Sequence, residues 1–345
     1  MDNAARTGPT AATQPDSYEV VVVGGGVAGL SAALTLARAR RAVLVVDAGR
    51  PRNSPAAHLH NYLSRDGAAP SELLAAGHDE VIGYGGHVMA GTVETVTRLD
   101  AGGFRVRLAD GSAVRARRLL VATGLIDELP DVPGVAERWG RDVLHCPYCH
   151  GWEVRDRAIG VLATAPRAVH AALLWRQWTT DVTLFRHTAP ELADTDREQL
   201  AARGIAVVDG TVTALQVSDD RLTGVRLAGG EVVARDAVVV LTRLTARADV
   251  LTALGLSTTE QRMGDHAIGT YVAGDPTGAT AVPGVWVAGN VADPMDQLIH
   301  AAAAGTRSGA AINADLVAED TARALDEYRG ATDSRTEAKT DRASA

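Results

Sequence analysis

A glycine-rich turn between two apolar strands, and a weaker copy of the same pattern later in the chain, predict an α/β fold. The expected architecture has two Rossmann-like dinucleotide-binding domains, each with three layers of the ββα type. The 345 residues are enough for two domains of ordinary size. Apolar residues make up 46% of the chain but aromatic residues only 4%, so Ala, Val and Leu must supply most of the core.

Residues 18–47 contain the stronger copy. A buried-strand pattern runs into the turn GGGVAG, an apolar helix follows, and a second strand ends at Asp47. Gly24 permits the tight turn, Gly26 lets backbone N–H groups approach a pyrophosphate, and Gly29 lets the helix pack closely on the strand. The helix N-terminus favours negative charge, and Asp47 is placed to hold ribose hydroxyls. We therefore predict a dinucleotide site here; the alternative is an ordinary glycine-rich turn.

Residues 159–187 align with the first unit without a gap. Alanines replace all three glycines of the fingerprint, and Arg186 stands at the position of Asp47. The replacing residues are Ala163, Ala165 and Ala168. A Cβ intrudes where a pyrophosphate should touch the backbone, and Pro166 removes one N–H donor. This unit is expected to keep the fold and bind dinucleotide poorly; the alternative is a relaxed NADP site in which Arg186 accepts a 2′-phosphate.

The net charge and the distribution of apolar residues limit the partners and the location that we expect for the protein. A net charge of −8, without any basic run that contains aromatic residues, excludes nucleic acid and anionic membranes as expected partners. Residues 20–37 are uncharged, but three glycines interrupt them, which indicates strand, turn and helix rather than a membrane span. The first 20 residues are polar, unlike a secretory signal, so we expect a cytoplasmic protein. Alternating patterns in residues 91–124 predict antiparallel strands.

Both cysteines of the chain lie in the six residues HCPYCH, His145 to His150. Cytosolic cysteine pairs of this kind tend to be catalytic, and the C-x-x-C spacing allows cycling between dithiol and disulfide. A zinc knuckle is one alternative, but adjacent histidines do not easily complete a tetrahedron. A structural disulfide is another, although so short a loop would remove little entropy from the unfolded chain.

These motifs, in this order, resemble the low-molecular-weight thioredoxin reductases and related pyridine nucleotide-disulfide flavoproteins. The resemblance rests on the GxGxxG turn at Gly24, the Ala122-Thr123-Gly124 turn, the CxxC that opens the second unit, and the closing Gly289-Asn290. It covers residues 18 to about 327. The string CPYCHGWE is more similar to the flavin-dependent dithiol oxidases that close the disulfides of gliotoxin-like and holomycin-like natural products.

The resemblance implies a domain layout and a homodimer. Residues 18–125 and 246–327 would form a discontinuous FAD-binding domain, and residues 126–245 an inserted NADPH-domain-like unit that carries CPYC. Residues 1–17 and 328–345, which are small and polar, are expected to be disordered tails. The cofactor-binding residues by resemblance are Gly24, Gly25, Gly26, Ala28, Gly29, Asp47, Asn61, Thr123, Gly124, Gly289, Asn290 and Gln297. Asn290 departs from the aspartate that the family usually has at this position.

The predicted function is an FAD-dependent dithiol oxidase that forms a disulfide within a small molecule and passes the electrons to O2, giving H2O2. Cys146 would exchange with the substrate thiols, Cys149 would face the flavin by the resemblance, and His150 would act as the base. Binding of NADPH is doubtful, because the second fingerprint lacks its glycines. The alternatives are an NADPH-dependent thioredoxin or disulfide reductase, and a flavin-bound redox sensor.

Overall fold

The structure, a computed structural model, describes residues 15–343. Its largest sheet has the strand order β3 (His87–Ala90), β2 (Val43–Asp47), β1 (Ser17–Val23), β6 (Ala113–Val121), β5 (Phe104–Leu108) and β4 (Val93–Arg98), and β19 (Val285–Val287) pairs with β6. β1 is parallel to both of its neighbours, and Val21 pairs with Leu44 of β2 and with Leu119 of β6. β4, β5 and β6 are antiparallel, as the alternation in this part of the sequence predicts.

The two faces of this sheet are covered by different layers. Helices α1 (Val27–Arg38), α2 (Pro70–Gly83) and α8 (Leu298–Ala343) pack on the face to which Val20 and Val22 point. On the opposite face lie α7 (Asp249–Thr252) and a sheet in the order β17 (Thr258–Met263), β18 (His266–Val272), β16 (Arg243–Ala246) and β7 (Leu125–Glu128). A Cβ on Gly305 of α8 would lie 2.0 Å from the carbonyl oxygen of Ala28, so glycine is what lets α8 touch α1.

The second unit keeps the same kind of fold. Its parallel sheet has the order β11 (Ala206–Val208), β10 (Val182–Phe185), β9 (Ile159–Leu162), β15 (Ala237–Val240) and β8 (Val143–Leu144). One core cluster joins this sheet to α5 (Ala168–Trp175) and α6 (Asp194–Ala202). A second cluster joins it to the antiparallel strands β12 (Val212–Ser218), β13 (Arg221–Leu227) and β14 (Val232–Ala234). The predicted fold, with two Rossmann-like units of three layers, is confirmed.

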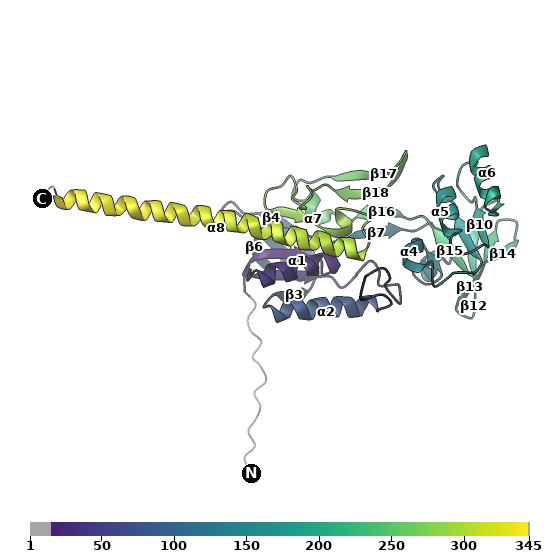
Figure 1. The fold of residues 1–345 in the computed structure, drawn as a ribbon, viewed down its shortest axis with the longest axis horizontal. Coiled ribbons are helices and arrows are strands. Elements are labelled where there is room, and N and C mark those ends of the chain that lie inside the picture. Colours follow the sequence, from purple (N-terminus) through teal and green to yellow (C-terminus); the bar gives the residue numbers. More distant parts are fainter. Residues whose placement is uncertain (1–14, 344–345) are drawn as a thin grey trace, which may run out of the picture.

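The two units lie side by side along the long axis of the molecule, with the second unit at the end away from the chain termini (Figure 1). The chain passes into the second unit through β7 and returns through β16. These two strands pair antiparallel, with Ile126 opposite Thr245. Three short elements complete the structure: α3 (Val135–Arg138), α4 (Pro147–His150) and the 3₁₀ turn η1 (Gly289–Val291).

The expectation of a disordered C-terminal tail from residue 328 is wrong, because α8 continues as a helix to Ala343. The segment has no proline and contains Ala, Glu, Lys and Arg, so a helix that is already nucleated can propagate through it. Most of the expected N-terminal tail, residues 1–14, lies outside the described residues, and Ser17 already belongs to β1. In the part of the chain that the structure describes, no helix has both the length and the apolar character needed to cross a bilayer.

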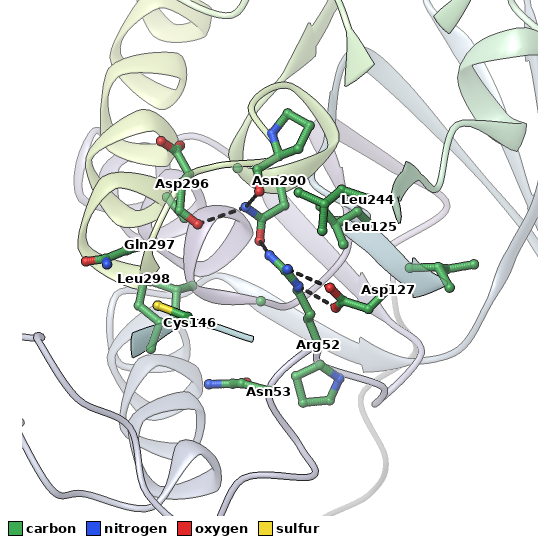
Figure 2. Close-up of a pocket in the computed structure, with 18 of the residues that line it drawn as sticks. Arg52, Asn53, Leu125, Asp127, Cys146, Leu244, Asn290, Asp296, Gln297 and Leu298 are labelled. Carbon is green, nitrogen blue, oxygen red and sulfur yellow. Dashed lines mark hydrogen bonds and ion pairs between the residues drawn. The ribbon is translucent and has the colours of Figure 1, made fainter. Parts of the chain in front are cut away.

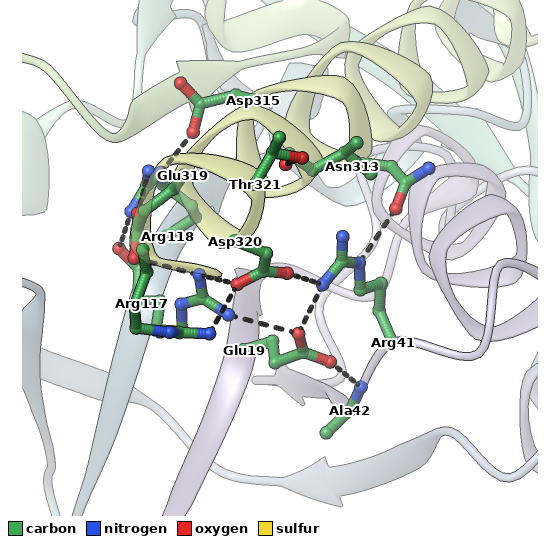
Figure 3. A network of polar contacts seen from close by, with 12 residues as sticks. Glu19, Arg41, Ala42, Arg117, Arg118, Asn313, Asp315, Glu319, Asp320 and Thr321 are labelled. Atoms are coloured by element: carbon green, nitrogen blue, oxygen red, sulfur yellow. Dashed lines mark hydrogen bonds and ion pairs between the residues drawn. The ribbon is translucent and has the colours of Figure 1, made fainter. Parts of the chain in front are cut away.

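A cluster of charges joins α8 to β6, an interior strand of the large sheet (Figure 3). Arg118 of β6 pairs with Asp315 at 2.5 Å and with Glu319, and Arg117 pairs with Asp320 at 2.6 Å. Arg41 also contacts Asp320, at 2.8 Å. Beyond this cluster the side chains of residues 321–331 are exposed, so the charges mark the place where α8 leaves the domain.

Candidate active site

A cavity of about 1250 Å³ lies between the two units, and residues from both of them line it. Most single-ligand pockets measure roughly 300–1,000 Å³, so this one has room for a dinucleotide and a small second molecule. Of the residues expected at the site, those that line the cavity are Gly24, Gly25, Gly26, Ala28, Asp47, Asn61, Thr123, Gly124, Cys146, Cys149, His150, Gly289, Asn290 and Gln297. Gly29 lies behind the wall of the cavity.

The glycine turn between β1 and α1 fits a dinucleotide. Gly24 has φ +107°, and a Cβ there would lie 2.4 Å from the carbonyl oxygen of Ala122. A Cβ on Gly29 would lie 1.9 Å from the carbonyl oxygen of Gly24, so this glycine serves the packing of helix on strand. A Cβ on Gly26 would meet no protein atom within 4 Å and would instead fill the space beside the N-terminus of α1. That space suits a phosphate group.

The opposite wall carries two arginines that the sequence did not single out. Arg50 and Arg247 line the cavity, and neither forms an ion pair with a described residue. The hydroxyl of Thr123 donates to the carbonyl of Arg247 at 2.7 Å, which places this arginine beside Gly124. Burial and then the charge of Arg50 lower the pKa of Arg247. Two neighbouring guanidinium groups without acidic partners suit an anionic ligand such as a pyrophosphate.

Asn290 in η1 orders the turn that leads into α8. Its amide nitrogen donates to the carbonyl oxygens of Asp293 at 3.1 Å and Asp296 at 2.9 Å. Its amide oxygen faces Arg52, with 3.4 Å between Oδ1 and a guanidinium nitrogen. An aspartate could not donate to those carbonyls, so an amide is required here. Gln297 ends the turn, and its carbonyl accepts the N–H of Ala301 at 2.9 Å.

The two cysteines lie at opposite ends of one helical turn. Cys146 precedes α4, and its carbonyl accepts the N–H groups of Cys149 and His150, both at 3.2 Å. A hydrogen bond from the thiol of Cys149 lowers the pKa of Cys146, and backbone N–H groups of the turn act in the same direction. The same hydrogen bond, together with burial, raises the pKa of Cys149. Of the two sulfurs, Cys146 therefore forms the thiolate more readily, and the thiolate is the nucleophilic form of cysteine.

Both histidines that flank the cysteines line the cavity. Burial lowers the pKa of His150, so its imidazole is neutral at pH 7 and is able to accept a proton. Burial, followed by the charge of Arg52, lowers the pKa of His145 to about 4. Asn61 of the first unit reaches over this motif, because its amide nitrogen donates to the carbonyl of Tyr148 at 2.6 Å. That contact was not predicted, since Asn61 was expected to contact the cofactor.

Comparison with known proteins gives the family. The sequence profile of the pyridine nucleotide-disulphide oxidoreductases matches residues 18–306. The chain belongs to this family. The prediction of a thioredoxin reductase-like flavoprotein is thereby confirmed, and membership implies a flavin cofactor.

Several known proteins are similar to this pyridine nucleotide-disulphide oxidoreductase over most of its chain. The crystal structure of HlmI is 51% identical, has a TM-score of 0.83, and covers 92% of this chain and 98% of its own. Thioredoxin reductase sirT of Leptosphaeria maculans is 30% identical, over 90% of this chain and 98% of its own. Thioredoxin reductase aclD of Aspergillus oryzae is 32% identical, over 79% of this chain and 88% of its own.

The second nucleotide-binding unit of this pyridine nucleotide-disulphide oxidoreductase differs from the first in its turn. In the alignment of the two units, helix α5 begins at Ala168, two residues later than the position that matches the start of α1. The N–H groups of Ala168 and Val169 already donate to backbone carbonyls of the turn. Arg186, the candidate for a 2′-phosphate, pairs with Asp209 at 2.5 Å and with Glu191 at 3.0 Å. Two acidic partners leave this guanidinium poorly suited to a phosphate.

The alternative of a zinc knuckle finds no support in the described part of the chain. Residues 15–343 contain no group of three or more His, Cys, Asp or Glu side chains arranged to hold a metal ion.

Proposed function

We propose that this protein is an FAD-dependent dithiol oxidase that closes a disulfide within a small molecule, with O2 as the electron acceptor. The observation that carries the proposal is the shared cavity, which the glycine turn of the first unit and the cysteine pair line together. Bound FAD would supply an acceptor for two electrons beside the two sulfurs. The Arg186 ion pairs favour an oxidase, because a protein that takes electrons from a dithiol does not need NADPH.

Cys146, Cys149 and His150 would have different roles in the reaction. With the pair oxidised, a substrate thiolate attacks Cys146, forms a mixed disulfide and releases Cys149 as a thiolate. The second substrate thiol then displaces Cys146 and closes the product disulfide, so the substrate loses two electrons and two protons. Cys146 is the exchanging sulfur because its position favours the thiolate, and exchange follows the same route in both directions. His150, neutral at pH 7, receives a substrate thiol proton.

The overall balance requires one O2 for each dithiol. Bound FAD would supply the acceptor for the two electrons of the cysteine pair, and O2 would take up these electrons with two protons to give H2O2. Asn61, Arg50 and Arg247 would hold and orient ligands around this path, and the turn ordered by Asn290 would place Gln297 at the start of α8.

The competing function is an NADPH-dependent disulfide reductase, and relatives that are named thioredoxin reductases, such as sirT, favour it. One anaerobic experiment separates the two. A dithiol should bleach the flavin absorbance of the purified protein stoichiometrically, whereas NADPH should not. Rapid bleaching by NADPH would refute the oxidase. Cys146→Ser and Cys149→Ser should each abolish dithiol turnover and keep FAD bound, and normal turnover in either would refute the relay.

A further inference from the structure

The connection between the two units is narrow. Strands β7 and β16 have four residues each and pair with one another, and Leu244 of β16 also pairs with Gly269 of β18 in the first unit. The chain crosses between the units where it leaves β7 and where it enters β16, and a few residues at the ends of such strands commonly act as hinges between domains. Cys146 belongs to the inserted unit, so its distance from the cofactor-binding turn depends on the angle at this junction.

The guanidinium group of Arg52 lies at this junction (Figure 2). Its Nε and one terminal nitrogen donate to the two carboxylate oxygens of Asp127 in β7, at 2.7 and 2.8 Å. The same terminal nitrogen lies 3.5 Å from Nε2 of His145, the residue before Cys146. The other terminal nitrogen lies 3.4 Å from Oδ1 of Asn290. One side chain of the first unit thus contacts the hinge, the redox motif and the cofactor wall.

The contacts continue into the second unit. The hydroxyl of Thr242, just before β16, donates to Asp127 at 2.9 Å, and Arg167 at the start of α5 donates to the carbonyl of Thr242 at 2.8 Å. Only 6% of the Asp127 side chain is exposed, and Thr242 is buried. The chain of hydrogen bonds therefore crosses the hinge through both of its strands.

The ion pair between Arg52 and Asp127 is better suited to fixing the angle between the two units than to stabilising the fold. A bidentate guanidinium–carboxylate pair defines a direction as well as a distance. A buried ion pair contributes little net stability compared with apolar packing, so its value lies in geometry. Burial alone would raise the pKa of Asp127, but Arg52 holds it below the ordinary value, so the carboxylate stays charged near pH 7.

We propose that Arg52 is a positioning residue whose fork on Asp127, extended by Thr242 and Arg167, fixes the angle between the two units and holds Cys146 at the cofactor side of the cavity. The inference does not depend on which way the electrons flow. It requires only that the cysteine pair exchange electrons with a cofactor in the first unit, so it applies to the oxidase and the reductase alike.

The test compares Arg52→Gln, Arg52→Lys, Asp127→Asn and Thr242→Val with the control Arg186→Gln, which breaks an ion pair within the second unit. The first readout is alkylation of reduced Cys146 by iodoacetamide, measured by mass spectrometry. We expect Arg52→Gln and Asp127→Asn to react at least tenfold faster, with faster amide hydrogen exchange in β7 and β16. Arg52→Lys should show a smaller effect, since it keeps the charge but loses the fork. The control should match the wild type.

The second readout is the anaerobic rate of flavin reduction by a saturating dithiol, which should fall at least tenfold in Arg52→Gln while the FAD content is unchanged. Wild-type alkylation and exchange in a folded Arg52→Gln protein would overturn the proposal. If that variant does not fold, Thr242→Val, which removes one hydrogen bond to the Asp127 carboxylate, must still accelerate exchange in both strands. If no dithiol reduces the wild-type flavin, the proposed function fails, and alkylation and exchange still decide the role of Arg52.

Discussion

The burial of His145 predicts that the protein loses stability in mild acid. Burial lowers the pKa of His145 from its ordinary value of 6.5 to about 4, and the charge of Arg52 acts in the same direction. The carboxylate of Asp127 opposes the shift without reversing it. In the unfolded chain the imidazole regains a pKa of about 6.5.

The sign and size follow from proton binding. Between pH 6.5 and about pH 4 the unfolded chain binds a proton at His145 that the folded protein excludes, so the free energy of unfolding falls as the pH falls. A fall in pKa from 6.5 to about 4, at 1.36 kcal/mol per pH unit, corresponds to about 3 kcal/mol. The loss is absent above pH 6.5 and is complete below about pH 4, where both states carry the proton.

The assay is urea unfolding of the wild type and of His145→Gln from pH 7.5 to pH 4, with His266→Gln as an exposed control. Glutamine keeps an acceptor for Arg52 but has no proton to gain. The gap between the wild type and His145→Gln should change by about 3 kcal/mol across this range, in favour of the variant at low pH. Parallel curves for the two proteins would mean that His145 titrates normally in the fold.

Three further predictions concern the cofactor turn, the turn before α8 and the helix itself. Gly24→Ala should lose most of its bound FAD, measured by absorbance, because a Cβ there would lie 2.4 Å from a backbone oxygen at φ +107°. Asn290→Asp should cost about 1–3 kcal/mol in thermal unfolding, because two carbonyls lose their donor. Arg118→Ala should cost about 1 kcal/mol and speed hydrogen exchange in α8 near Glu319, because the ion pairs are partly exposed.

The sequence predicted the parts of the site that depend on neighbours in the chain. Gly24, Gly26 and Gly29 all belong to one turn of a few residues, so their spacing alone predicts a role for each. In the structure Gly24 has φ +107°, and a Cβ on Gly29 would lie 1.9 Å from the carbonyl oxygen of Gly24. The cysteine pair is equally local. The repeat at residues 159–187 was visible because both copies keep the same strand and helix pattern, even after the glycines were lost.

The junction could not be predicted in this way. Arg52 and Asp127 are 75 residues apart, and Arg167 and Thr242 are also separated by 75. No periodicity links such pairs, because they meet only in the complete tertiary structure. The one available signal was weak: Asp127 and Thr242 are polar residues that directly follow apolar strand-like segments. The extent of α8 was missed for another reason, since composition typical of disorder is also compatible with an exposed helix.

The two Rossmann-like units differ in how well each is prepared to bind an anionic ligand. In the first unit the glycines remain and two arginines face the cavity without acidic partners, so the site is open to an anionic ligand. In the second, alanine stands at each glycine position and Arg186 is already paired with two carboxylates. Binding NADPH there would require breaking these ion pairs before any phosphate contact formed. The cysteine pair needs no such rearrangement, because Cys146 already lines the shared cavity and its pKa is lowered. These observations support the proposal that electrons enter at the sulfurs.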